Sequence, residues 1–330
     1  WIWPMRDGGT NQPAPLVYRG TIYLNNTDGV VQAIRARDGS LIWEHRIDTA
    51  IASRGIALYE DKLIFQSSGR LIALNARTGE LDWDVQMQGS RASSSGPLAA
   101  NGLILEGMGG CQRYDESKCF ICAYDPDTGE QRWRFVTIAL DGEPGGDSWG
   151  GLPNLYRAGG ETWITGSYAP GLNLTYWGVG NPGPDWNGDV RLGDNLFSDS
   201  VVALDADTGA LKWHFQFTPH DVYDYDSVQV PVLADIQWQG KPRKAMLFGN
   251  RNGIFYVLDR ANGQFLLGKP FTKVTWTTGL DAKGRPQNMV PLTEDGVLIY
   301  PGVQGGTNWY SPSFSQRTNL FYMPMWGDTY

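Results

Sequence analysis

One short pattern recurs along the chain and ends in tryptophan four times. The copies are AIRARDGSLIW ending at Trp43, ALNARTGELDW at Trp83, AYDPDTGEQRW at Trp133 and ALDADTGALKW at Trp213. A fifth copy, VLDRANGQFLL over 257–267, keeps the Asp and Gly but has Leu267 in place of tryptophan. Each copy is typical of a strand, a tight turn and a second strand, because glycine adopts a positive φ at little cost and Asx residues favour turns. We expect each tryptophan to pack beside the next copy.

A further pair of short strands precedes each copy, as in PLVYRGTIYLNN and IALYEDKLIFQSSG. Four strands in a repeat of roughly 40–50 residues is the length expected of a propeller blade. The 42 glycines and 19 prolines favour turns over helix interiors, and no sustained helical pattern is present. The sequence therefore predicts an all-β protein, a β-propeller with four-stranded blades.

The number of blades in the sequence indicates whether the propeller domain is complete. Five are clear, and a sixth is expected to begin near Asp295 and to run into TNLFYMPMWGDTY. A propeller left open would expose sheet edges, so the chain either closes with few blades or is part of a longer propeller. We expect residues 1–330 to form a single propeller domain that is incomplete at its C-terminal end.

Composition and charge exclude several classes of protein. The net charge is −8, with no basic cluster, which argues against nucleic acid and anionic membranes as partners. No apolar run approaches the ~18 residues of a membrane span. Three cysteines and three histidines make a zinc site improbable. The chain opens at Trp1 without methionine or signal peptide, so we expect a leader to have been trimmed or to lie outside it. The oligomeric state is not indicated.

Two segments have the composition of functional loops. The gap between Trp133 and Trp213 is longer than the others and contains DGEPGGDSWGGLPN and GNPGPDWNGDVRLGDN. Behind Trp213, the stretch TPHDVYDYDS places Asp224 and Asp226 two residues apart. In extended backbone both side chains would point the same way, and two like charges so close are costly unless a cation lies between them. His220 and Asp221 are expected to cap the loop.

The Asp-x-x-Thr-Gly-x-x-x-Trp pattern resembles the tryptophan-docking motif of the eight-bladed quinoprotein alcohol dehydrogenases, which use pyrroloquinoline quinone (PQQ). The segments that most resemble this family's active-site blade are TWITGSYAPGLNLTYWGVGNPGP (162–184), VVALDADTGALKWHFQFTPHDVYDYDS (201–227) and GKPRKAMLFGNRNGIFYVLDRANGQF (240–265). The resemblance covers nearly the whole chain, without the family's last two blades. It implies PQQ, a metal ion, oxidation of an alcohol, a cytochrome c electron acceptor and a periplasmic location.

The resemblance also implies roles for individual residues. Trp163 corresponds to the tryptophan that forms the floor under the quinone ring, and flat aromatic faces suit flat cofactors. Arg54 and Arg251 correspond to cationic contacts to the carboxylates of the quinone, for which arginine offers a bidentate fork. The other residues that the resemblance places at the cofactor are Ser94, Gly110, Cys111 and, at the reactive carbonyl edge, Asn308.

The metal ligands implied in the same way are Gln112, Asn181, Asp224 and Asp226. Asp224 is also the implied catalytic base. An acid at the position of Asp226 marks lanthanide-using members, although some calcium-using members carry it. Gln112 stands where the family has a glutamate, which weakens the charge match to a cation and slightly favours calcium over a lanthanide.

The chain also departs from the family at its cysteines. An adjacent cysteine pair caps the quinone in many members, but its positions here are Asp48 and Thr49. Two residues are inserted between Cys111 and Cys119. These two cysteines bracket a polar loop, and we predict a disulfide between them, which suits an oxidising compartment. In CFIC (119–122), residues an odd number apart on a strand face opposite sides, so a redox pair is not expected there.

Two alternatives stay open. Within the same family, the missing cysteine lid and the altered 111–122 loop favour a sugar, polyol or bulky secondary alcohol as substrate. In another class, a non-catalytic scaffold propeller would have no reason to keep Trp163, Asn181, Asp224 and Arg251 together. No C-x-x-C-H is present, so these residues carry no covalent haem.

Overall fold

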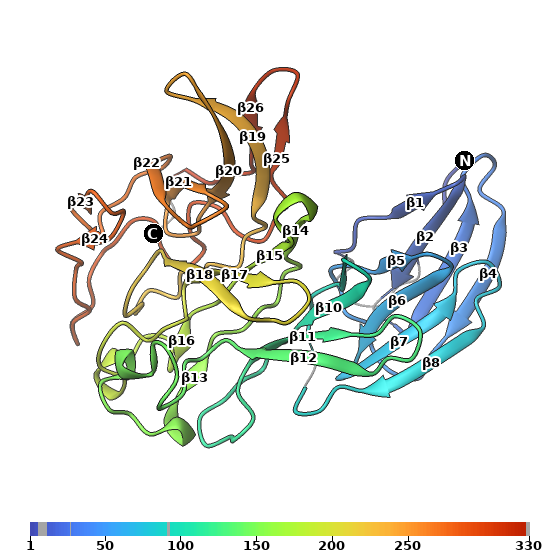
Figure 1. Ribbon diagram of the computed structural model, residues 1–330, viewed down its shortest axis with the longest axis horizontal. Helices are drawn as coiled ribbons and strands as arrows, with labels where there is room; N and C mark the ends of the chain where they lie inside the picture. Colours follow the sequence, from blue (N-terminus) through green and yellow to red (C-terminus); the bar gives the residue numbers. More distant parts are fainter. Residues whose placement is uncertain (6–11, 27, 91–92, 328–330) are drawn as a thin grey trace. The chain divides into compact units, whose positions relative to one another are not determined.

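A computed structural model describes every residue of the chain except 6–11, 27, 91–92 and 328–330 (Figure 1). Within the described residues the regular elements are β-strands and short 3₁₀ helices, which confirms the all-β prediction. The 3₁₀ helices are η1 (Gly146–Trp149), η2 (Asn154–Tyr156), η3 (Pro170–Leu172) and η4 (Gly188–Val190). No helix in that part of the chain is long and apolar enough to cross a lipid bilayer.

The chain divides into two compact units. The first contains residues 1–110, 120–135 and 163–165, and the second contains residues 111–119, 136–162 and 166–330. The expectation of one propeller domain over 1–330 stays a prediction.

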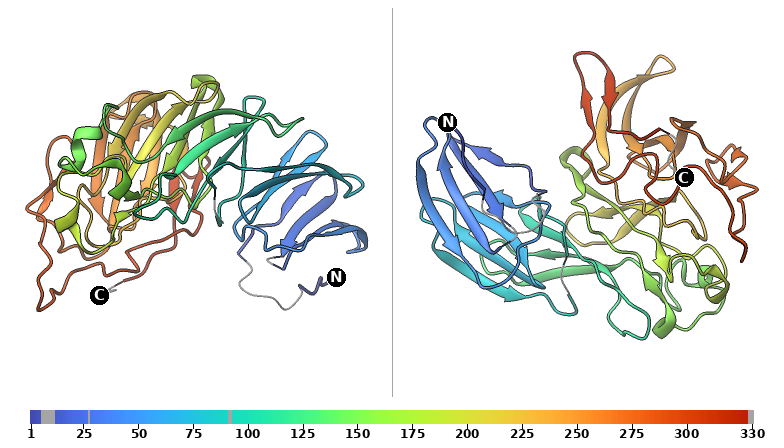
Figure 2. Two further views of the ribbon diagram at one scale, coloured as in Figure 1. Left: turned by 90° about the horizontal axis from the view of Figure 1, so that it is seen from below. Right: turned by 180° about the vertical axis from the view of Figure 1, so that it is seen from behind.

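The first unit is built from three four-stranded antiparallel sheets, whose strands lie side by side in sequence order (Figures 1 and 2). The first sheet has β1 (Leu16–Tyr18), β2 (Thr21–Asn26), β3 (Val30–Arg35) and β4 (Leu41–Arg46). The second has β5 (Ala57–Tyr59), β6 (Lys62–Ser67), β7 (Arg70–Asn75) and β8 (Leu81–Gln86). The third has β9 (Leu98–Ala100), β10 (Leu103–Gly107), β11 (Phe120–Tyr124) and β12 (Gln131–Val136).

The second unit contains two further four-stranded sheets. One has the order β14 (Ser167–Ala169), β15 (Leu174–Gly178), β17 (Ser200–Asp205) and β18 (Leu211–Gln216). The other has β19 (Val232–Trp238), β20 (Lys241–Gly249), β21 (Ile254–Asp259) and β22 (Phe265–Pro270). Three strand pairs complete the unit: β13 (Ala158–Gly159) with β16 (Pro182–Gly183), β23 (Gly279–Leu280) with β24 (Pro286–Gln287), and β25 (Ser313–Ser315) with β26 (Leu320–Tyr322).

The expected sixth blade is represented among the described residues by the β25–β26 hairpin, and the end of its predicted segment, 328–330, lies outside them. Strand β25 lies beside β19, so the hairpin extends the packing of the fifth four-stranded sheet.

The repeated pattern forms the turn between the third and fourth strands of a sheet. In the second sheet the Asn75 side chain accepts hydrogen bonds from the backbone N–H groups of Arg77 and Thr78. Gly79 follows with a φ of 75°. The Trp43 ring from the preceding sheet packs on this turn and donates from Nε1 to the Ala76 carbonyl at 3.0 Å. The expected packing of the tryptophan on the next copy is therefore confirmed here.

The same docking recurs at two other copies. Trp83 donates to the Pro126 carbonyl at 2.9 Å, and the Trp213 ring lies against Gly263. A Cβ on Gly263 would stand 2.7 Å from that ring. Glycine is needed at these turns both for the backbone conformation and for the approach of the tryptophan.

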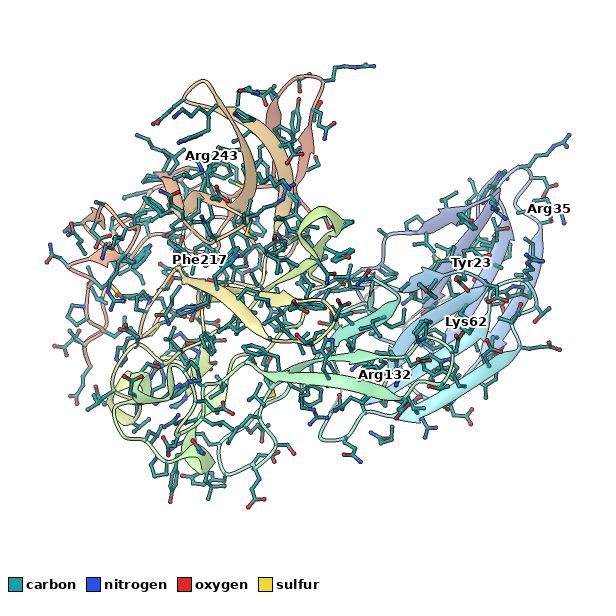
Figure 3. All side chains as sticks on the ribbon, in the orientation of Figure 1. Tyr23, Arg35, Lys62, Arg132, Phe217 and Arg243 are labelled. Atoms are coloured by element: carbon teal, nitrogen blue, oxygen red, sulfur yellow. A yellow bond between two sulfur atoms is a disulfide. The ribbon has the colours of Figure 1, made fainter. Side chains whose placement is uncertain are left out.

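Aromatic packing anchors the segment that carries the two acids. Phe217 (Figure 3) is fully buried and stacks on Phe248, with ring centroids 4.6 Å apart. Tyr223 and Tyr225 both pack on Trp276, at centroid distances of 5.7 and 5.5 Å. Because these tyrosines flank Asp224, their burial fixes the backbone from which the acid side chains project.

A buried acid also lies within the first unit. Glu106 on β10 is 1 % exposed. The Ser95 hydroxyl and the Gly107 amide favour the ionised form, but burial outweighs them and holds the pKa of Glu106 well above its usual range.

We expect Gly79→Ala to destabilise the protein far more than Gly20→Ala. Both glycines have a φ near +80°, but a Cβ at Gly79 would stand 2.6 Å from the Trp43 ring, whereas none of the described atoms lies within 4 Å of one at Gly20. Both variants carry the backbone cost of roughly 1–2 kcal/mol, and Gly79→Ala adds a packing cost of roughly 1–3 kcal/mol. Denaturant unfolding measures the difference. Equal losses would contradict the docking role of the tryptophan.

Glu106 predicts a pH dependence of stability. Its folded-state pKa is raised, so the native state keeps a proton that the unfolded state releases above the ordinary value of 4.5. Stability should therefore fall as pH rises from about 4.5. We expect Glu106→Gln to match the wild type near pH 4 and to become progressively more stable than it by pH 8, as measured by urea unfolding. The exposed Glu60→Gln is the control, and parallel curves for wild type and Glu106→Gln would refute the prediction.

Candidate active site

Three predicted cofactor residues are brought together in the first unit. Arg54 Nη1 donates to Ser94 Oγ at 2.7 Å, and its guanidinium carbon lies 4.5 Å from the Trp163 ring centroid. Ser94 Oγ also donates to the Trp163 carbonyl at 3.2 Å. A half-buried aromatic ring, a guanidinium and a hydroxyl thus share one place. This set suits a planar ligand that carries carboxylates.

Close approach of two linkers makes this cluster possible. Arg54 lies between β4 and β5, Ser94 lies between β8 and β9, and the Arg54 N–H donates to the Ser94 carbonyl at 3.0 Å. A Cβ on Gly96 would stand 2.7 Å from the backbone of Gly55, so glycine is required at this contact. Gln12 adds a partner that the sequence analysis missed, because its Oε1 accepts from Arg54 Nε at 2.8 Å.

The second unit holds the acid pair on one arginine. Arg251 donates from Nη1 to Asp226 at 2.7 Å and from Nη2 to Asp224 at 3.1 Å. Its side chain is only 8 % exposed, so this is a buried ion-paired group. The guanidinium supplies a positive charge between the two acids, which offsets their mutual repulsion.

The backbone of the acid segment differs from the prediction. Asp224 and Asp226 have φ values of 62° and 26°, so the segment is not extended. The Asp221 carboxylate accepts from the N–H groups of Tyr223 and Tyr225 at 2.9 and 2.8 Å and turns the chain. The expected loop-capping role of Asp221 is confirmed. The two acids meet because both reach Arg251, and not because of strand alternation.

Burial shapes the protonation of these acids. It raises the pKa of Asp224 to about 7, against the opposing effect of Arg251 and with a further rise from Asp226. Burial likewise raises the pKa of Asp221 to about 6. Asp199, which the sequence analysis missed, is fully buried, and its pKa is raised well above the usual range by burial and by Asp221 and Asp226. A single acid at the start of a strand carries no sequence signal.

Asn181 lies against the acid pair. Its N–H donates to Asp226 Oδ1 at 3.1 Å. The preceding residue, Gly180, leaves room for that oxygen, since a Cβ there would stand 2.4 Å from it. The predicted ligands Asn181, Asp224 and Asp226 are thus neighbours, and they offer the oxygen donors that hard cations prefer.

Three carboxyl, thiol or imidazole groups do not converge on one point anywhere in the described part of the chain. A metal site here would therefore need amide oxygens as well as the two aspartates. Asn181 carries such an oxygen on its side chain, and its backbone N–H contacts Asp226; carboxylate and amide oxygens are donors that suit a hard cation.

The predicted disulfide between Cys111 and Cys119 is present, and Cys122 is buried as a free thiol on β11. Gln112, next to the disulfide, has an exposed side chain. The Cys111 N–H donates to the carboxylate of Glu161 at 3.1 Å. The sequence analysis did not single out Glu161, because this contact joins segments 50 residues apart.

The structure shows other contacts for the remaining residues that the sequence analysis singled out. Gly110 has a φ of 80°, which favours glycine. Asn308 accepts from the Trp309 N–H at 2.9 Å and donates to the Gln304 carbonyl at 3.3 Å. At the position of the family's cysteine lid, the Thr49 hydroxyl pairs with Ser67 at 2.7 Å.

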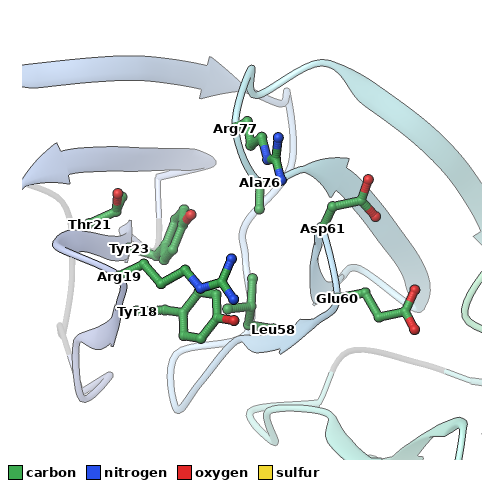
Figure 4. A pocket seen from close by; sticks show the side chains of 9 residues that line it. All are labelled: Tyr18, Arg19, Thr21, Tyr23, Leu58, Glu60, Asp61, Ala76 and Arg77. Carbon is green, nitrogen blue, oxygen red and sulfur yellow. The ribbon is translucent and has the colours of Figure 1, made fainter.

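A separate hollow in the first unit contains none of the predicted site residues. Its volume is about 460 Å³. Figure 4 shows its lining by Tyr18, Arg19, Thr21, Tyr23, Leu58, Glu60, Asp61, Ala76 and Arg77. These residues come from the turns β1–β2, β5–β6 and β7–β8 and the strands beside them.

We expect Arg251→Gln to destabilise the metal-free protein by roughly 3–5 kcal/mol, because it leaves the buried Asp226 and the half-buried Asp224 without their cation. The loss should be larger at pH 8 than at pH 5, where the carboxyls of raised pKa can take up protons. Arg285→Gln is the matched control, since Arg285 also binds an acid through two nitrogens but is 53 % exposed, and it should cost at most about 1 kcal/mol. Urea unfolding at both pH values measures these changes, and similar losses in the two variants would contradict the account.

Comparison with known proteins places the chain in a family. The PQQ family model described as "Glucose/ethanol/alcohol dehydrogenase, beta-propeller domain" matches residues 4–278. Quinoprotein alcohol dehydrogenase PedH of Pseudomonas putida is 35% identical over 99% of this chain and 62% of that protein. Quinohemoprotein alcohol dehydrogenase of Comamonas testosteroni is 36% identical over 98% of this chain and 50% of that protein. The chain thus spans between half and two thirds of the length of these relatives.

Solved structures agree with this placement. The crystal structure of the Comamonas testosteroni enzyme matches 96% of this chain and 51% of its own, with a TM-score of 0.87 and 36% identity. A europium-containing methanol dehydrogenase matches 98% of this chain and 63% of its own, with a TM-score of 0.88 and 28% identity. The four-stranded sheets are therefore propeller blades, as the sequence predicts. The chain belongs to the PQQ-dependent alcohol dehydrogenase family.

Proposed function

We propose that the protein is a PQQ- and metal-dependent dehydrogenase that oxidises the hydroxyl group of an alcohol. The observation that carries this function is the pair of carboxyls, Asp224 and Asp226, gathered on Arg251 beside Asn181. A general base and a set of oxygen ligands for a cation are thereby available in one place.

The cofactor is proposed to lie on Trp163, with Arg54 and Ser94 as donors to its carboxylates. Further contacts are assigned to Arg251, Gly110, Cys111 and Asn308. When bound, the quinone would supply a hydride acceptor for the alcohol carbon, and the metal ion would supply a Lewis acid for the quinone carbonyl. Asp224 accepts the proton of the substrate hydroxyl. A cation bound beside it would favour the ionised form of this carboxyl, which is the form that a base needs.

The metal ion is proposed to bind Asn181, Asp224, Asp226 and Gln112, and to be calcium or a lanthanide. Bound there, a cation would stabilise the ionised forms of both aspartates. It would also compete with Arg251 for them, so that the guanidinium becomes available to the cofactor. The neutral Gln112 slightly favours the lower charge of calcium.

The substrate is proposed to be a small-molecule alcohol, and one observation favours a sugar, polyol or bulky secondary alcohol as the second candidate. Asp48 and Thr49 occupy the place of the family's cysteine lid, and Thr49 pairs with Ser67. The electron acceptor is proposed to be a cytochrome c in the periplasm, a compartment that suits the Cys111–Cys119 disulfide.

We expect Asp224→Asn to lower PQQ-dependent oxidation of alcohols by the chain on the order of 10²–10⁴-fold, because an amide cannot accept the hydroxyl proton. Dye-linked turnover with added PQQ and Ca²⁺ or La³⁺ measures the activity, and the absorbance of bound quinone reports the cofactor. The quinone absorbance should be retained. The exposed Asp189→Asn serves as the control and should leave turnover unchanged. Full turnover in Asp224→Asn would refute its role as the base.

A further inference from the structure

Glu161 contacts two chain segments that carry proposed metal ligands, the segment of Asn181 and the segment of Gln112. Its backbone carbonyl accepts from the Gly180 N–H at 2.8 Å, next to Asn181. Its carboxylate accepts from the Cys111 N–H at 3.1 Å, next to Gln112. Both contacts lie within the second unit.

The surrounding backbone makes this placement rigid. Strands β13 and β16 pair Ala158 with Gly183 and Gly159 with Pro182. The Gly160 N–H donates to the Asn181 carbonyl at 2.9 Å, and the Gly159 N–H donates to the Cys111 carbonyl at 3.3 Å. Three chain segments, around residues 111, 160 and 181, are therefore held side by side.

Glu161 and Gln112 differ in charge. Gln112 is neutral, and its side chain is exposed, whereas Glu161 is an acid in a half-buried position. On the other side of Gly180 lies Asp226, whose Oδ1 approaches within 2.4 Å of where a Gly180 Cβ would stand, while the Glu161 carbonyl is 3.2 Å from that point. Glu161 thus lies between the acid pair and the Gln112 segment.

We propose that Glu161 supplies the negative charge that Gln112 lacks on this side of the metal site, and that its hydrogen bond to Cys111 positions the Gln112 segment. The inference rests on the proposed function, since it assumes a cation bound by Asn181, Asp224 and Asp226. A carboxylate beside a cation lowers the energy of the bound ion through Coulomb attraction, even without direct coordination. The attraction scales with the charge of the ion, so it is greater for a trivalent than for a divalent ion.

Glu161→Gln separates charge from geometry, because the Gln Oε1 can still accept from the Cys111 N–H. With PQQ present, we expect the affinity of the full chain for Ca²⁺ to fall about 10–100-fold, as is common for partners of metal ligands. The fall should be larger for Tb³⁺. Calorimetry measures Ca²⁺ binding, and luminescence measures Tb³⁺ binding. The stability of the metal-free protein should stay unchanged. Glu143→Gln is the matched control, since Glu143 also accepts from a backbone N–H, that of Leu140, and it should bind both ions like the wild type.

The double variant Glu161→Gln, Gln112→Glu returns the charge to the neighbouring segment. We expect it to regain metal affinity to within about threefold of the wild type. Three results would overturn the inference and leave the proposed function standing. They are wild-type metal affinity in Glu161→Gln, an equal fall in affinity for Ca²⁺ and Tb³⁺, and no recovery of affinity in the double variant. A wild-type chain that binds neither ion in the presence of PQQ would overturn the proposed function and the inference with it.

Discussion

The site depends on how one buried and one half-buried carboxyl are kept together. Asp224 and Asp226 would repel one another as anions, and burial adds a desolvation cost to each charge. Arg251 offsets both effects by donating to the two acids at once, and its Nε is held by the Val303 carbonyl at 2.9 Å. The Tyr223 and Tyr225 rings, packed on Trp276, fix the backbone from which the acids project. The aromatic core therefore sets the geometry, and the guanidinium makes the charge arrangement stable.

This arrangement relates the metal-free protein to a metal-bound one. Under the proposed function, a cation that binds the same two carboxylates would take over from Arg251 part of the compensation of their charge. The fully buried Asp199 lies behind the pair, where burial, Asp221 and Asp226 raise its pKa and favour its neutral form. The proposed contribution of Glu161 would come from the other side, where the Cys111 amide donates to its carboxylate.

Much of the fold follows from local chemistry that a sequence displays. The Asn75 turn, the positive φ of Gly79 and the docking of Trp43 involve residues whose types dictate their conformations, so the repeat predicts them. Arg54, Ser94 and Trp163 could be grouped only through a family resemblance, because their contacts join distant parts of the chain. Gln12, Asp199 and Glu161 were missed for the same reason. The extended backbone expected at Asp224–Asp226 was wrong because Asp221 redirects the chain through two amides.

The most direct test of the account is anomalous diffraction from crystals of the chain grown with PQQ and a lanthanide. We predict an anomalous peak beside the carboxylates of Asp224 and Asp226 and the side chain of Asn181, with the quinone lying on the Trp163 ring. A quinone bound elsewhere, or crystals in which both carboxylates stay paired to Arg251 with no ion beside them, would contradict it.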